Sequence, residues 1–180
     1  MLDVKSNTPC FFTQQLFLIG SYNEDGQAHF APISWVSYTW GEPSCLIISM
    51  NGTKKTKANV ARTKRLSATV VTPDLLSFSE QVATASDKAA LIRETVKTIP
   101  GNVVDVPLIA GAKFSYECEI LQTVELGDTI TYFAQIKQIN LSADVASLDW
   151  YDLNEINPVV YSPDNYFLVG KHIGKIGDFS

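Results

Sequence analysis

The chain has 180 residues, of which 14 are Lys or Arg and 19 are Asp or Glu, and 46% of its positions are apolar. A chain of this length buries about 70% of the surface that it exposes when unfolded, so it can form a core without disulfides or structural metal. The composition excludes a disordered tail and a fibre. The longest apolar runs fall far short of the roughly 20 residues that a membrane helix needs. We expect one globular domain over residues 1–180 that does not insert into a membrane.

Cysteine and histidine are few and scattered. Cys10, Cys45 and Cys118 are odd in number and lack CxxC spacing. This pattern, without a recognisable signal segment, indicates structural thiols and a cytoplasmic setting. His29 and His172 do not lie at ligand spacing from Cys, His or carboxylate residues. The sequence therefore predicts no metal site.

The first half of the chain is predicted to form strands separated by turns. Residues 16–21 and 27–38 are rich in β-branched and aromatic residues, and the turn formers of 23–26 lie between them. This arrangement predicts a hairpin. Residues 45–50 (CLIISM) form a short apolar run that ends at Asn51-Gly52, which predicts another strand followed by a turn.

A helix is predicted after that turn. Thr53 and Thr56 are both N-cap residue types, so the helix could begin at either. Residues 66–71 then return as a strand.

The second half combines a helical excursion with two long strands. Pro73 and Ser86-Asp87 open two helices within residues 72–113. Residues 114–124 and 129–141 flank a tight turn and form the clearest hairpin, and residues 159–161 and 166–169 are short strand candidates. Several antiparallel strands with few helices predict a closed or nearly closed β-barrel, and no GxGxxG is present to support a Rossmann domain.

Positive charge is concentrated in one segment. No acidic residue lies between Glu42 and Asp74, whereas six basic residues do, so the segment carries +6 and the rest of this −5 chain carries −11. Such a block either solvates a helix face or binds an anion. A pI near 5.0 and the lack of a basic-aromatic stripe argue against nucleic acid. A small phosphate ligand fits the scale of the segment better.

The same segment has the parts of a phosphate site. Free N–H groups at a helix N-terminus attract an anion, Ser49 and a threonine can donate, and Lys54 or Lys55 can neutralise it. The Walker spacing GxxxxGK[ST] is not met, so nucleotide triphosphate hydrolysis is not supported.

Short segments along almost the whole chain resemble a known family. They are Gly20, Asp25-Gly26, 31–38 (APISWVSY), Pro43, 48–49, 55–63 (KTKANVART), 106–107, 117–120 (ECEI), 158–161 (PVVY), Tyr166 and Gly170. In this order they resemble the flavin reductase-like, FMN-binding split-barrel family. The resemblance implies a mainly β fold with a few helices, an antiparallel split barrel, and a homodimer with FMN near the subunit boundary.

The resemblance also implies a cofactor site. Ser34, Trp35, Val36 and Ser37 would lie beside the flavin ring, Ser49, Met50 and Asn51 would flank the ring and ribityl chain, and Lys54, Lys55, Thr56 and Asn59 would lie at the phosphate. No catalytic side chain is assigned, because a flavin carries the hydride and the electrons itself. The implied function is an FMN-binding oxidoreductase that moves electrons from NAD(P)H to a flavin or another small-molecule acceptor.

Two departures from the family pattern concern the nicotinamide side. Family members usually carry Gly-Asp-His before the last long strand, where this chain has Gly127-Asp128-Thr129. They often carry a large group after the closing tyrosine, where this chain has Ser162. The alternatives are therefore an FMN-binding electron carrier or sensor without NAD(P)H turnover, and an interaction protein that has lost its cofactor.

Overall fold

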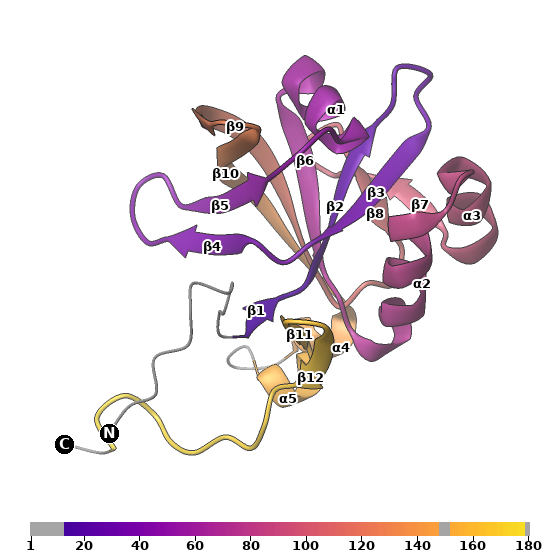
Figure 1. Ribbon diagram of the computed structural model, residues 1–180. Coiled ribbons are helices and arrows are strands. Elements are labelled where there is room, and N and C mark those ends of the chain that lie inside the picture. The colour runs from indigo at the N-terminus through magenta and orange to yellow at the C-terminus, as the bar shows by residue number, and fades with distance from the viewer. Residues whose placement is uncertain (1–12, 148–151, 179–180) are drawn as a thin grey trace, which may run out of the picture.

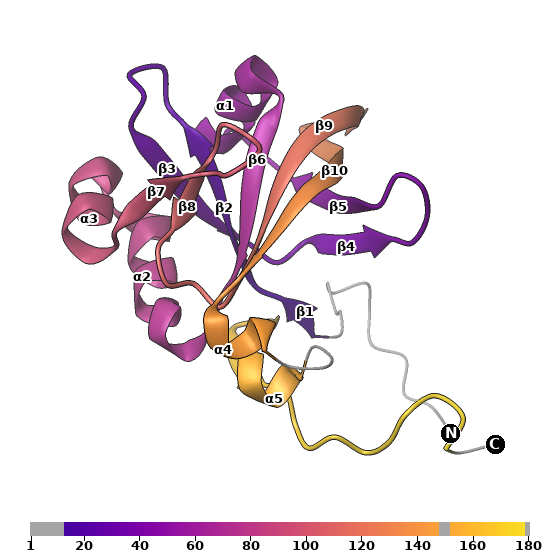
Figure 2. The same ribbon diagram turned by 180° about the vertical axis from the view of Figure 1, so that it is seen from behind.

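A computed structural model describes residues 13–147 and 152–178. The elements are β1 (Gln14–Gln15), β2 (Phe17–Tyr22), β3 (Ala28–Ile33), β4 (Val36–Thr39), β5 (Cys45–Met50), α1 (Lys55–Thr63), β6 (Arg65–Val70), α2 (Pro73–Thr84), α3 (Lys88–Thr95), β7 (Thr98–Pro100), β8 (Pro107–Ile109), β9 (Phe114–Leu126), β10 (Thr129–Leu141), α4 (Ala143–Ala146), α5 (Leu153–Ile156), β11 (Val159–Ser162) and β12 (Asn165–Leu168). Figure 1 and the reverse view in Figure 2 show a curled sheet with α1 at one end and α2 and α3 against one flank.

Seven strands form the main sheet, in the order β3-β2-β6-β9-β10-β5-β4, and every neighbouring pair is antiparallel. The two edge strands, β3 and β4, are consecutive in the chain and are joined only by Ser34 and Trp35. A two-residue connection can reach the opposite edge only if the sheet curls until its edges meet. The predicted antiparallel split barrel is therefore confirmed.

Alternating side chains divide the core into two layers. Phe17 and Ile19 of β2 point into the barrel interior, whereas Leu18 between them packs on the outer layer under α2 and α3. This is the period-two alternation of a strand that is covered on both faces. Val60 of α1 is fully buried in the interior cluster, so α1 covers one end of the barrel.

Gly20 allows a close approach across the sheet. A Cβ added there would collide with the Ser67 hydroxyl and would lie 2.7 Å from a ring carbon of Phe30 and 2.8 Å from the Pro107 carbonyl oxygen. Only glycine fits such a backbone contact without moving its neighbours.

Glu117 of β9 is fully buried and organises the loop before β8. Its Oε1 accepts from the Asn102 backbone N–H at 2.8 Å and from Asn140 Nδ2 at 2.9 Å. Its Oε2 accepts from the backbone N–H groups of Val103 at 2.8 Å and Val104 at 2.7 Å. Burial alone raises the pKa of Glu117, but these hydrogen bonds together hold it below its ordinary value.

The predicted elements agree closely with the structure, with some differences. Strands β5 and β10 have the predicted bounds, and α3 begins after Asp87, whose side chain accepts from the Ala90 N–H at 3.0 Å. The segment 27–38, predicted as one strand, is divided into β3 and β4 because it must pass from one sheet edge to the other. The excursion 72–113 also contains the two-stranded sheet β7-β8, which the prediction missed.

The cysteines within the described residues are packing groups. Cys45 and Cys118 are free and buried, as predicted, and burial raises the pKa of the Cys118 thiol. Cys10 lies outside the described residues. Among the helices that the structure describes, none combines the length and the apolar character needed to cross a membrane.

Candidate functional site: a cavity between α1, β3 and α3

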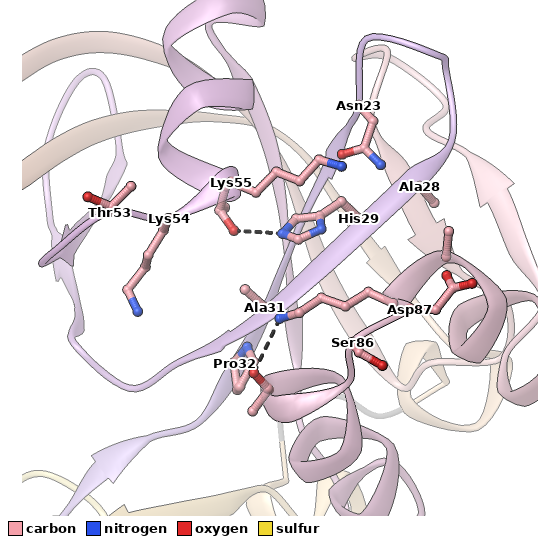
Figure 3. A pocket seen from close by; sticks show the side chains of 14 residues that line it. Asn23, Ala28, His29, Ala31, Pro32, Thr53, Lys54, Lys55, Ser86 and Asp87 are labelled. Atoms are coloured by element: carbon pink, nitrogen blue, oxygen red, sulfur yellow. Dashed lines mark hydrogen bonds between the residues drawn. The ribbon is translucent and has the colours of Figure 1, made fainter.

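A cavity of about 550 Å³ lies between the start of α1, strand β3 and the segment that joins α2 to α3 (Figure 3). Its lining residues are Asn23, Ala28, His29, Ala31, Pro32, Thr53, Lys54, Lys55, Thr56, Ala83, Ser86, Asp87, Lys88 and Ala89. The sequence predicts a phosphate site around the start of α1, and the cavity at this position is also lined by β3 and by the segment between α2 and α3.

The N-terminus of α1 opens on this cavity. Lys54 occupies the N-cap position, and no side chain caps the helix there. The prediction that Thr53 or Thr56 caps α1 is therefore wrong. Because the first N–H groups of a helix have no partner within the helix, an uncapped N-terminus offers donors and a positive dipole end to an anion.

Thr56 has another partner. Its hydroxyl lies 3.0 Å from Nε2 of His29, and both side chains are buried. This contact ties the first turn of α1 to β3. Thr56 is the second residue of α1, so it does not occupy the N-cap position. Burial, together with the positive charges of Lys88 and Lys55, lowers the pKa of His29 to about 4. His29 is therefore neutral at pH 7.

Three lysines line the cavity: Lys54, Lys55 and Lys88. Figure 3 shows Lys55 extending past His29 toward Asn23, while Lys54 extends away from it. Ion pairs among the described residues join Arg65 to Asp105, Lys113 to Asp144 and Lys137 to Glu119, so the cavity lysines have no carboxylate partner there. The cavity consequently carries excess positive charge.

Several of the residues predicted to flank a flavin ring lie close to one another, although none of them lines the cavity. Pro32 lines the cavity, and Ser34 to Ser37 follow it through the connection into β4. The Ser49 N–H of β5 donates to the Trp35 carbonyl at 2.9 Å, and the Ser49 hydroxyl lies 2.8 Å from that of Thr131. Ser34 is buried, Val36 is half-buried, and Trp35 and Ser37 are exposed.

Three other predicted site residues lie away from the cavity lining. The Met50 side chain is fully buried in the barrel core, and Asn51 is exposed in the turn after β5. Asn59 is buried, and its Nδ2 donates to Ser21 Oγ at 3.1 Å and to Asn23 Oδ1 at 3.0 Å. Asn59 thus joins α1 to the β2-β3 hairpin and does not line the cavity.

The cavity residues that the sequence interpretation missed include His29 and Lys88. His29 lies within strand β3, where the sequence does not show which face its side chain occupies. Lys88 is separated from Lys55 by 32 intervening residues. It also missed Lys57, whose Nζ donates to the carbonyls of Gly52 at 2.9 Å and Asp128 at 2.6 Å. No local motif marks these positions, since each depends on how distant elements pack. The described residues contain no group of three or more His, Cys, Asp or Glu placed to hold a metal ion.

Comparison with protein families gives one decisive match. The profile described as "Flavin reductase like domain" matches residues 10–169, which is most of the chain. The chain belongs to the flavin reductase-like family. This membership supports a flavin-related oxidoreductase function and agrees with the resemblance seen in the sequence. Among curated proteins, no significant match was found.

Solved structures share the fold of this flavin reductase-like protein at low sequence identity. A flavoredoxin of Desulfovibrio vulgaris (Miyazaki F) is 16% identical with a TM-score of 0.89, covering 99% of this chain and 98% of its own. A flavoredoxin from Methanosarcina acetivorans is 19% identical with a TM-score of 0.87, covering 99% and 97%. An FMN-binding protein from Thermus thermophilus, with bound 1-cyclohex-2-enone, is 16% identical with a TM-score of 0.78, covering 97% and 99%.

Proposed function

We propose that this protein binds FMN and acts as a cytoplasmic oxidoreductase that passes electrons from NADH or NADPH to a flavin or another small-molecule acceptor. The observation that carries the proposal is the cavity into which the uncapped N-terminus of α1, Lys54 and Lys55 face. Two buried, free thiols, Cys45 and Cys118, are compatible with a reducing compartment.

The residues present fit an FMN molecule at both of its ends. At the phosphate end, backbone N–H groups of α1 would donate hydrogen bonds, and Lys54 and Lys55 would neutralise the dianion. At the ring end, the β3-β4 connection and the adjoining strand β5, where the Ser49 N–H donates to the Trp35 carbonyl, would provide a backbone wall. A bound flavin supplies hydride and electron transfer, and the protein supplies its position and hydrogen bonds.

A second candidate, an electron carrier or sensor without direct NAD(P)H turnover, is favoured by the turn before β10. Thr129 stands where many family members have a histidine, so a titratable ring is missing from that position. Lys57 also donates to the Asp128 carbonyl at 2.6 Å, which ties this turn to the loop before α1. The two candidates differ in their electron donor and share the FMN site.

One titration separates these functions. The purified protein is mixed with FMN, its absorption spectrum is recorded, and NADH or NADPH is then added without oxygen. We expect FMN to bind, and bleaching of the bound flavin by a nicotinamide supports the reductase. Bound flavin that stays oxidised with NADH and NADPH but bleaches with dithionite supports the carrier. Failure to bind FMN contradicts both and favours an interaction protein.

We further propose that the protein is a homodimer with the flavin near its interface. Apolar side chains that are ordinarily buried are exposed on β4 and the residues that flank it, and on the second half of β9: Trp35, Tyr38, Trp40, Leu121, Val124 and Leu126. Trp40 is 95% exposed and Leu126 is 80% exposed, which is typical of surface that a partner covers.

Light scattering during size-exclusion chromatography tests this proposal. We expect a mass near twice that of the 19.8 kDa chain, because an apolar patch gains free energy when a second copy covers it. Trp40→Glu should shift the protein toward the monomer without unfolding it, since the side chain is almost fully exposed and its ring contact is with the exposed Tyr38. A monomeric wild type at micromolar concentration that still binds FMN would contradict the proposal.

A further inference from the structure

The cavity has a second cationic wall that no sequence motif marks. Lys88 is the first residue of α3 and lines the cavity opposite the start of α1, together with Ser86, Asp87 and Ala89. Figure 3 shows Ser86 and Asp87 on the segment that faces the α1 lysines across β3. A ligand in this space would therefore contact α1 on one side and the α2-α3 segment on the other.

Lys88 is held in the cavity but is not neutralised there. Its side chain is half-buried, and its Nζ donates to the Ala83 carbonyl at the end of α2 at 3.3 Å. Among the described residues, one carboxylate lines the cavity: Asp87, which is the N-cap of α3 and accepts from the Ala90 N–H. An ammonium group has three N–H donors, so Lys88 keeps donors for a further acceptor.

The pKa values of Lys88 and His29 also indicate that the positive charge of the cavity is not neutralised by the residues that line it. Burial lowers the pKa of Lys88, and the positive charge of Lys54 lowers it further. The charges of Lys88 and Lys55 likewise add to the burial that lowers the pKa of His29. Like charges that depress one another's protonation would be relieved by an anion between them.

We propose that Lys88 is a ligand of the phosphate group that this cavity binds, so that the phosphate is held between α1 and α3 and not by α1 alone. The identity of the ligand as FMN rests on the proposed function above. The contribution of Lys88 to the binding of a phosphate group does not depend on the rest of the ligand. It can therefore be measured with inorganic phosphate, separately from FMN binding.

The test compares wild type, Lys88→Gln, Lys88→Arg and the control Lys97→Gln. Lys97 lies just beyond α3, is exposed and does not line the cavity, so its replacement makes the same change in net charge. Affinities for FMN and for riboflavin, which lacks the phosphate, are measured by quenching of flavin fluorescence. Stabilisation by inorganic phosphate at constant ionic strength is measured as a shift in melting temperature.

We expect Lys88→Gln to weaken FMN binding by about tenfold, the effect of losing one charge-assisted hydrogen bond, and to leave riboflavin binding unchanged. Lys88→Arg should restore most of the FMN affinity, and Lys97→Gln should match wild type. Equal losses for FMN and riboflavin, or no loss for FMN, would overturn the role of Lys88. If wild type binds no FMN but phosphate stabilises it and not Lys88→Gln, the proposed function fails while the phosphate site stands.

Discussion

Replacing Glu117 by glutamine is expected to lower the free energy of unfolding by about 3 kcal/mol, which is roughly 10 °C in melting temperature for a chain of this size. Each carboxylate oxygen accepts from two N–H donors. Glutamine has one oxygen and one NH₂ group, so either orientation of its amide would place a donor against two other donors. Urea unfolding, followed by circular dichroism, measures the change.

Glu119, two residues further along β9, provides a matched control. It is half-buried, and it is 3.7 Å from Lys137 in a partly exposed ion pair. Because exposed ion pairs contribute about 1 kcal/mol or less, Glu119→Gln should have little effect. If both variants lowered the free energy of unfolding equally, the hydrogen bonds to Glu117 would not be the cause of the lost stability.

The same residue predicts how stability depends on pH. The pKa of Glu117 is lower in the folded protein than in the unfolded chain, where a glutamate titrates at about 4.3. Its contribution is therefore fully present above the unfolded pKa and is lost as the pH falls through the folded pKa. Glu117→Gln should flatten this acid side of the stability curve, and Glu119→Gln should not.

The double variant Lys54→Gln, Lys55→Gln is expected to weaken FMN binding roughly 50-fold, since two exposed charge-assisted contacts to a phosphate together contribute about 2 to 2.5 kcal/mol. Riboflavin affinity should stay within about twofold of wild type, because the ring wall around Trp35 and Ser49 is unchanged. Fluorescence titrations with both flavins at low and at high salt provide the measurement.

A control with the same loss of charge is Lys64→Gln, Lys97→Gln. Both lysines are exposed and neither lines the cavity. If this control weakens FMN binding as much as the cavity variant does, long-range attraction and not a phosphate site is responsible. If the FMN affinity of the cavity variant were unchanged, Lys54 and Lys55 would not bind the phosphate and would only face solvent.

Local chemistry was sufficient to predict most strands and helices. Strands β5 and β10 could be bounded from the sequence because each is an apolar or alternating run between turn residues. The start of α3 could be found because Asp87 is a strong N-cap residue. In each case, the signal and the structure that it specifies lie within a few residues of one another.

The cap of α1 could not be predicted in this way. Thr56 is a good cap residue by type, but α1 begins one residue before it, and its hydroxyl contacts His29, which lies 27 positions earlier in the chain. The division of 27–38 into β3 and β4 also depends on distant structure, since it occurs where the two sheet edges meet.

The sequence by itself determined the class of fold, the family resemblance and the concentration of positive charge around α1. Turn chemistry, side-chain alternation and charge are all properties of neighbouring residues. Only the tertiary structure decided that Lys88 and His29 share a cavity with Lys54 and Lys55, that Asn59 lies outside it, and that Glu117 is a buried structural carboxylate. These outcomes depend on the curl of the sheet and the packing of α3 against β3, which bring together side chains that are far apart in the chain.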